Sequence, residues 1–285
     1  ANGPVQSIRK ILENESLGIN GNISSIPDGV TGDTDLWANF SVPLGEFSPN
    51  KEIPFSASAK IRHARIPKAI LGNDFEKGEL RIDVDGDRLR VLGISDFNGS
   101  PFTFEQETLF NNNSEVNGTK KFSLNITSTD LKKLNLPIPL ELDGMISLKA
   151  KIIDLAEGNS KVNATIDLMS SELSIPQLNW KKPLGSVGRL TVDVDIQNNK
   201  VMKLNNINLI TSDLNINAQA NITGISKGTS KITAVIDLIN SDLSIPHLNW
   251  RKPSGSAGRL RVAADIQNSK LIKLRTINLV ATDLN

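Results

Sequence analysis

The chain has 285 residues, and its 32 Lys and Arg against 31 Asp and Glu give a formal net charge of +1 at pH 7. Basic and acidic residues are interspersed, so the sequence shows no electrostatic footprint for nucleic acid. The absence of Cys excludes disulfide frameworks, zinc–thiolate clusters and thiol nucleophiles. The length suffices for one large or two ordinary domains.

The first predicted element is a short helix over residues 4–14. It begins with Pro4, and Val5, Ile8, Ile11 and Leu12 follow at helical spacing. Proline is favoured at the start of a helix, and this apolar spacing gives one buried stripe. No run of the chain reaches the roughly 18–20 apolar residues of a membrane-spanning helix, and no signal peptide opens it.

After this helix, alternation of apolar and polar residues predicts a succession of strands. They are expected near residues 17–23, 34–42, 54–62, 78–85, 88–95, 100–108, 119–127, 138–142 and 145–153, with one helical turn over 128–134. The triplet Asp85-Gly86-Asp87 lies between two such runs and predicts a hairpin turn. A calcium loop is the alternative interpretation, but the glutamate required at its twelfth position is missing.

A block of 58 residues occurs twice, seventy residues apart. The copies run from Gly158 to Asn215 and from Gly228 to Asn285, and 36 of the 58 aligned positions are identical. A long fixed period indicates a repeat architecture, in which each unit buries its apolar side against its neighbours.

The repeated block has the period of β-structure. Leu190, Val192, Val194 and Ile196 alternate with polar residues, and similar alternation runs through 162–168 and 214–222. Because successive side chains of a strand point to opposite faces, each run predicts a sheet with one apolar and one polar face. The polar links Gln197–Lys200 and Gln267–Lys270 read as hairpin turns.

The sequence therefore predicts an all-β chain of roughly 15–17 strands, built as a long, curved, mostly antiparallel sheet that forms a repeating β-groove. Three parts are expected. They are an N-terminal part of the groove over 1–157 that includes the helix, a first repeat copy over 158–227, and a second, truncated copy over 228–285.

Candidate groove residues come from the apolar side of the first copy. The set comprises Val162, Ile166, Leu168, Val192, Val194, Ile196, Ile207, Leu209, Leu214, Ile216 and Ala218. If the groove is open, some of these apolar side chains remain accessible, a combination that marks a binding surface. If two sheets close on each other, the same residues form a buried core, and periodicity alone does not separate the two cases.

Each copy also carries a Trp followed by paired basic residues. These are Trp180, Lys181 and Lys182 in the first copy and Trp250, Arg251 and Lys252 in the second. Trp and basic side chains are favoured at lipid headgroups, so the loop is a candidate for contact with a membrane interface. The alternative is a crossover connection whose Trp seals an edge of the sheet.

The remaining candidates for chemistry are few. Asp193 and Asp195 lie on the polar side of a strand, and the second copy has Ala263 in place of Asp193. The two histidines are His63 and His247, and His247 occupies the position of Gln177 in the other copy. No nucleophile is accompanied by a base, so we expect neither an enzyme nor a metal or cofactor site.

Several motifs remain, and they are Gly3-Pro4 with the following helix, Val30-x-Gly32-x-x-x-Leu36, Ala64-x-Ile66-Pro67-x-x-x-Leu71-Gly72, Gly78-x-Leu80, Val84-x-Gly86-x-x-Leu89, Phe97-Asn98-Gly99-Ser100-Pro101 and the Leu-x-Trp-x-Lys-Pro loop of both copies. Together they resemble the AsmA-like superfamily of bacterial envelope proteins, especially its YhdP-type members. The resemblance covers essentially the whole chain.

The resemblance implies a non-enzymatic segment of a periplasmic protein whose repeating β-groove moves phospholipid between the inner and outer membranes. Acyl chains would be its ligands. The chain does not begin with Met, and its second copy stops within a predicted strand. We therefore expect a fragment whose inner-membrane anchor lies outside it. The alternative is a structural or adhesive β-repeat protein with a closed sandwich core.

Overall fold

The computed structural model describes most of the chain. The described ranges are residues 2–12, 29–41, 55–70, 73–97, 100–110, 115–133, 141–175, 180–198, 200–212, 215–223, 229–237, 242–245, 250–267 and 270–281. Contacts divide the chain into two compact units, Ala1–Leu124 and Asn125–Asn285. Both repeat copies lie in the second unit, whereas the sequence placed the first boundary at residue 157.

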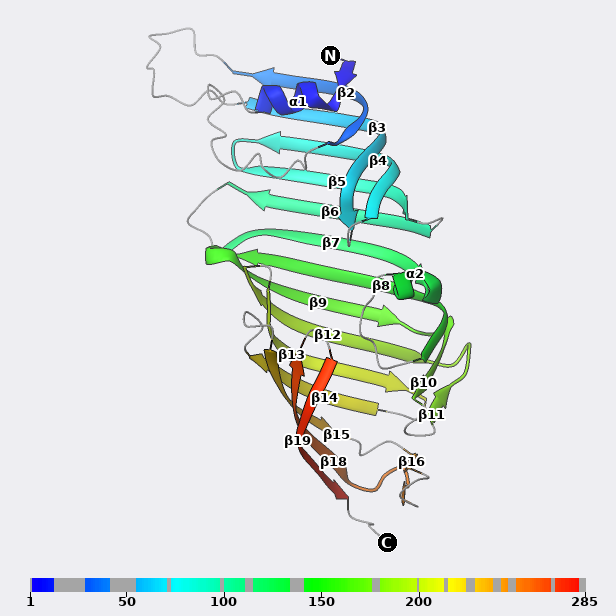
Figure 1. The fold of residues 1–285 in the computed structure, drawn as a ribbon. Helices are drawn as coiled ribbons and strands as arrows, with labels where there is room; N and C mark the ends of the chain where they lie inside the picture. Colours follow the sequence, from blue (N-terminus) through cyan, green and yellow to red (C-terminus); the bar gives the residue numbers. More distant parts are fainter. Residues whose placement is uncertain are drawn as a thin grey trace. The chain divides into compact units, whose positions relative to one another are not determined.

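The first unit is an antiparallel meander with one helix (Figure 1). Its elements are β1 (Asn2–Pro4), α1 (Val5–Leu12), β2 (Thr31–Phe40), β3 (Phe55–Ile70), β4 (Asn73–Asp85), β5 (Arg88–Phe97), β6 (Ser100–Leu109) and most of β7 (Val116–Thr127), whose residues 125–127 belong to the second unit. Each strand from β2 to β6 pairs with the next, and β1 pairs with β2. The predicted helix and the predicted order of strands are confirmed for the residues described; residues 17–23 lie outside them.

Cross-strand register collects the apolar residues of the first unit on one face. Ala59 stands opposite Ile82 and Ile61 opposite Leu80, and all four are buried. At one end of this face α1 packs on β2 with Val5 buried. The face is therefore a packed core over much of its area.

Phe75 closes this core near the end of the β3–β4 pair. The register of that pair shifts at several points, and Lys77 adopts a left-handed φ of 54°. The ring of Phe75 packs edge-on against that of Phe102, with centroids 5.6 Å apart. A Cβ at Gly78 would clash with the Phe75 ring, so glycine is needed there to admit it.

The predicted hairpin at Asp85-Gly86-Asp87 is confirmed. Val84 pairs with Leu89 across the turn. The Asp85 carboxylate accepts hydrogen bonds from the backbone N–H groups of Asp87 and Arg88, at 2.9 and 3.0 Å. This carboxylate acts as a local turn cap of the kind that Asp commonly supplies.

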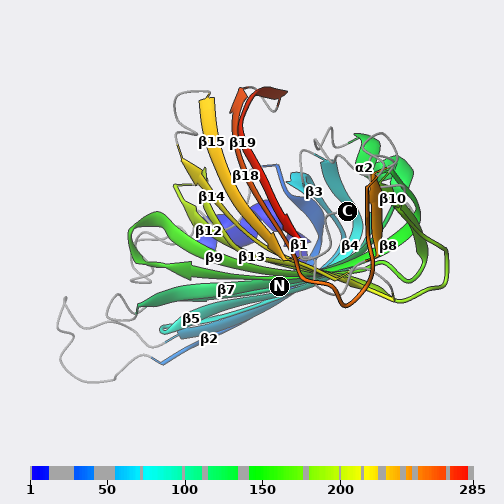
Figure 2. The ribbon, with the colours of Figure 1, turned by 90° about the horizontal axis from the view of Figure 1, so that it is seen from below.

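The second unit contains an antiparallel sheet in the order β8-β9-β12-β13-β14-β15-β18-β19. The strands are β8 (Glu141–Leu155), β9 (Asn159–Asp167), β12 (Gly188–Gln197), β13 (Lys200–Thr211), β14 (Asn215–Thr223), β15 (Thr229–Asp237), β18 (Gly258–Gln267) and β19 (Lys270–Ala281). Helix α2 (Ser128–Lys133), predicted as one helical turn, precedes β8, and the 3-10 turn Ala156–Gly158 follows it. Figure 2 shows that the strands rotate progressively through the unit, as the twist of β-strands requires.

Two short hairpins interrupt this sheet's sequential order. β10 (Ser171–Ile175) and β11 (Trp180–Lys182) separate β9 from β12, and β16 (Leu243–Ile245) and β17 (Trp250–Lys252) separate β15 from β18. One period of the repeat contributes four strands to the sheet. Because four is even, β9 and β15 run in the same direction, and both hairpins leave the same margin of the unit (Figure 1).

The two copies share their irregularities as well as their strands. Relative to β12, β13 carries one extra residue at Asn205 and another at Met202. The β18–β19 pair has the same two bulges, at Arg275 and Ile272. Such bulges increase the local twist. Here they also keep Val201, Leu204 and Ile207, which are three residues apart, opposite the alternate residues of β12. The predicted turns after Gln197 and Gln267 are confirmed by the pairing of these residues with Lys200 and Lys270.

The prediction of an all-β chain dominated by a curved antiparallel sheet is confirmed. The alternation of apolar and polar residues in the sequence predicted these strands. The observed pairing keeps it, because apolar residues stand opposite apolar residues on neighbouring strands.

Phe75→Ala is expected to lower the free energy of unfolding of the first unit by about 3–5 kcal/mol, because it removes a buried ring and leaves a cavity. Chemical denaturation followed by circular dichroism measures the change. Ile94→Ala is the control, since Ile94 is largely exposed and its truncation should cost less than about 0.5 kcal/mol. Equal effects of the two substitutions would contradict the assignment of Phe75 to the core.

Candidate functional site

Backbone register places a continuous set of apolar residues on one face of the second unit, which we call the apolar face. Its members are Leu148, Ala150 and Ile152 of β8; Val162, Ala164 and Ile166 of β9; Leu190, Val192, Val194 and Ile196 of β12; Val201, Leu204, Ile207 and Leu209 of β13; Ile216, Ala218 and Ala220 of β14; Ile232, Ala234 and Ile236 of β15; Leu260, Val262 and Ala264 of β18; and Leu274, Ile277 and Leu279 of β19.

The apolar face is only partly covered. Val162, Val192 and Val194, from adjacent strands, are half-buried. On β19 the exposure rises, to 46% for Leu274 and 60% for Ile277. Ala150, Leu209 and Ala264 are buried. Accessible aliphatic side chains that adjoin across many strands form a surface to which an apolar ligand can bind.

The structure brings together most of the predicted groove residues. Val162, Ile166, Val192, Val194, Ile196, Ile207 and Leu209 share the apolar face, and the backbones of Ile216 and Ala218 continue it. Leu214 lies outside the described residues. Leu168 differs from the others because it follows the last residue of β9; like Leu209, it is buried. Its backbone N–H donates to the carbonyl of Gly188 at 2.8 Å, so it ties β9 to β12 at the margin of the sheet.

The prediction omitted the members contributed by β8, β15, β18 and β19. The sequence did predict apolar residues on β15, β18 and β19, because these strands belong to the second copy of the repeat. Leu260, Val262 and Ala264 repeat Leu190, Val192 and Val194 at a distance of seventy residues. The face in the structure is thus about twice as wide as the set chosen from one copy.

The polar side of the same sheet is held by hydrogen bonds between neighbouring strands. Asn163 donates to Asp193 at 2.7 Å, and Asn205, at the bulge, donates to Asp195 at 2.7 Å. In the second copy Arg275 takes the place of Asn205 and pairs with Asp265 at 2.7 Å. These aspartates therefore hold neighbouring strands and the bulges in place, and this structural role explains their presence on the polar side.

The Trp-containing loops fold as the hairpins β10–β11 and β16–β17. Trp180 pairs with Ile175 across the first hairpin and is 5% exposed. β10 also pairs with the first residues of β8, where Leu173 stands opposite Leu142. The first hairpin is thus joined to the sheet through backbone pairing, and its Trp contributes to a small core.

Lys182 anchors the first hairpin from inside the protein. Its side chain is 0% exposed, and its ammonium group donates to the carbonyls of Ser171 at 2.8 Å and Pro183 at 3.1 Å. Burial lowers the pKa of Lys182, and the negative charge of Asp167 opposes that shift. A buried ammonium is tolerated only when hydrogen bonds and an opposite charge compensate for lost water.

The second copy repeats this arrangement at Lys252. That side chain is 1% exposed and donates to the carbonyl of Pro253 at 3.2 Å. Burial lowers its pKa too, and Asp242 and Asp237 oppose the shift. Two copies that conserve a buried lysine point to a structural requirement of the hairpin.

In the first triplet only Lys181 faces solvent, and in the second Arg251 is exposed whereas Lys252 is buried. Lys181 pairs with Glu172 at 2.6 Å, and Arg251 pairs with Asp242 at 3.0 Å. Contact with lipid headgroups therefore stays a prediction for Lys181 and Arg251. The burial of Trp180, Lys182 and Lys252 fits the alternative interpretation, a connection that closes an edge of the sheet.

The described residues offer no other chemical site of the kinds considered from the sequence. No group of His, Asp and Glu among them could hold a metal ion. His63 is exposed and lies 3.3 Å from the exposed Asp33, and His247 falls outside the described ranges. Within the same part of the chain no helix is long and apolar enough to cross a membrane.

Comparisons with known proteins add no assignment. The chain matches no protein-family model, and neither the curated proteins nor the solved structures contain a match to it. The functional interpretation therefore depends on the sequence patterns and on the geometry of the apolar face.

Gly188→Ala should destabilise the second unit by about 1–3 kcal/mol through overpacking. A Cβ at Gly188 would clash with Cε of Lys182 and lie 3.0 Å from Cβ of Leu168. Lys182 is fully buried and its ammonium donates to two carbonyls, so movement of its side chain away from the new Cβ would strain those hydrogen bonds. Thermal unfolding measures the loss.

Gly86→Ala provides the control, because nothing lies within 4 Å of a Cβ at Gly86. Its unfolding midpoint should stay close to that of the wild type. An unchanged midpoint for Gly188→Ala would show that Lys182 does not pass beneath this glycine.

Proposed function

We propose that the second unit binds the acyl chains of phospholipids on its apolar face, as a non-enzymatic segment of a lipid-transfer protein. The observation that carries this proposal is the register, which aligns aliphatic residues across eight paired strands and leaves many of them accessible. The resemblance to AsmA-like proteins, noted above from sequence motifs, favours a periplasmic location for this activity.

The composition of the apolar face suits tails better than headgroups. Its members are Ile, Leu, Val and Ala, which offer no donor or acceptor beyond the backbone. Burial of an acyl chain there gains about 0.8 kcal/mol for each CH₂ removed from water. Binding of this kind is non-directional, so a tail can be held at many positions along the face and is not fixed at one of them.

The partial exposure favours this function over a closed sandwich. In a sandwich the residues of the inner faces are packed against each other. Val192, Val194 and Ile196 all retain accessible surface on a central strand. A β-repeat protein with a closed sandwich core would leave no continuous accessible apolar surface, whereas a lipid carrier needs one.

Val194→Asp tests the proposal directly. The new carboxylate is expected to repel acyl chains and to remain partly hydrated, because Val194 is half-buried. Phospholipid bound to the purified chain, quantified by mass spectrometry after extraction, should fall at least several-fold, while the unfolding temperature stays near that of the wild type.

Thr191→Asp supplies the matched control. Thr191 lies on the same strand and is also half-buried, but its register places it on the polar face. The control should retain its lipid. Unfolding of the Val194→Asp variant would instead indicate a buried, unpaired charge in a closed core, and equal lipid content in both variants would also contradict the proposal.

A further inference from the structure

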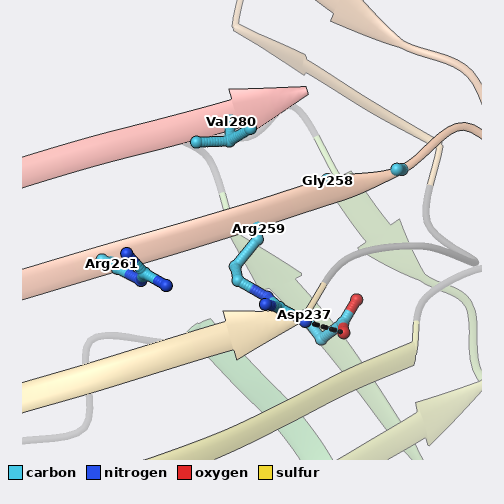
Figure 3. Close-up of a pocket in the computed structure, with 6 residues that line it drawn as sticks. Asp237, Gly258, Arg259, Arg261 and Val280 are labelled. Atoms are coloured by element: carbon cyan, nitrogen blue, oxygen red, sulfur yellow. Dashed lines mark ion pairs between the residues drawn. The ribbon is translucent and has the colours of Figure 1, made fainter. Parts of the chain in front are cut away.

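A hollow of about 330 Å³ lies on the polar face of the second unit, on the side of the sheet opposite the apolar face. It is lined by Asp237 at the end of β15, by Ala257 just before β18, by Gly258, Arg259 and Arg261 of β18, and by Val280 of β19 (Figure 3). This volume is at the lower end of the range of small-ligand pockets, roughly 300–1,000 Å³.

The residues that line this hollow carry more positive than negative charge. Arg259 pairs with Asp237 at 3.5 Å, and both side chains are about half exposed. Arg261 lies two residues further along β18, exposed on the same face. The strand residues directly opposite Arg261 are Val235 and Asn278, which carry no charge. Two guanidinium groups therefore share one carboxylate among the residues that line the hollow.

Burial lowers the pKa of Lys252, and the negative charges of Asp242 and Asp237 both oppose that shift. Asp237 therefore pairs with Arg259 and also acts electrostatically on Lys252. An added anion would be attracted to the excess positive charge near Arg259 and Arg261.

The first copy of the repeat lacks this excess. Its corresponding residues are Asp167, Val187, Gly188, Arg189, Thr191 and Ile210, so that Thr stands where the second copy has Arg261. Asp193 stands where the second copy has Ala263. Between two copies that are otherwise so similar, these substitutions add one positive charge and remove one negative charge at the same place.

We propose that Arg261 and Arg259 bind a phosphate group in this hollow. A guanidinium presents several N–H donors in a fixed plane that matches two oxygens of a phosphate, and such charge-assisted bonds are stronger than neutral ones. Ala257 and Val280 provide an apolar wall beside the arginines. The phosphate can belong to a free phosphorylated solute or to the headgroup of a membrane lipid.

This site does not depend on the proposed acyl-chain binding. The lining strand residues Arg259 and Arg261 alternate with Leu260 and Val262 of the apolar face, so the two surfaces lie on opposite sides of the same strand. A variant at Arg261 can therefore fail to bind phosphate while it still binds lipid tails, and a variant at Val194 can do the reverse.

Titration calorimetry with inorganic phosphate, at constant ionic strength set by chloride, is the first measurement. Arg261→Thr installs the residue of the first copy and should weaken binding by about tenfold or more, since one charge-assisted contact is worth at least that factor. The reciprocal double variant, Thr191→Arg with Asp193→Ala, should add a second phosphate site. Thermal unfolding of each variant checks that the fold is kept.

Vesicles distinguish the two sources of phosphate. Wild type and Arg261→Thr are sedimented with phosphatidylcholine vesicles that contain or lack phosphatidic acid. Arg261-dependent sedimentation with phosphatidic acid assigns the site to a headgroup, whereas Arg261-dependent binding of inorganic phosphate alone assigns it to a free solute. Binding that Arg261→Thr leaves within twofold of wild type overturns the proposal. So does a double variant that gains no site, or a wild type that binds neither probe.

Discussion

The structure of the second unit depends on the register of its strand pairs. Because side chains alternate between faces, a slip of one residue would move a whole strand's apolar set to the opposite face. The pairing avoids this from β8 to β19, even though β13 and β19 each contain two bulges. The bulge residues Asn205 and Arg275 bond to Asp195 and Asp265, and these contacts hold the bulges at fixed positions. Register therefore produces both the apolar face and the charged hollow behind it.

The two hairpins connect β9 to β12 and β15 to β18 at the margin of the sheet, away from the centre of its apolar face. β10–β11 leaves the sheet at its margin and is anchored there by the buried ammonium of Lys182. Gly188 gives the lysine room to pass. The same residues recur in the second copy, with Lys252 and Gly258 both buried. The connection is thereby confined to one margin, and the centre of the face stays accessible.

Much of the fold could be predicted from the sequence, since alternation of apolar residues and the exact period of the repeat require only local patterns. The strands, the turns after Gln197 and Gln267, and the helix α1 all followed from such patterns. The burial of Lys182 could not be foreseen, because it depends on carbonyl acceptors that meet only when the hairpin folds. Leu168 was expected in the groove, but it lies beyond the end of β9, where its backbone N–H donates a hydrogen bond to the carbonyl of Gly188. The excess charge at Arg261 becomes visible only when cross-strand neighbours are known.

Photolabelling can locate acyl chains bound to the apolar face. The purified chain is loaded with a phospholipid that carries a photoactivatable group near the end of one tail, irradiated, digested and mapped by mass spectrometry. We expect adducts on alternate residues of β12 and β13, at Val192, Val194 and Ile207, with none at Thr191 or Asp193. Adducts spread evenly over both faces, or confined to the polar face, would contradict binding of acyl chains to the apolar face.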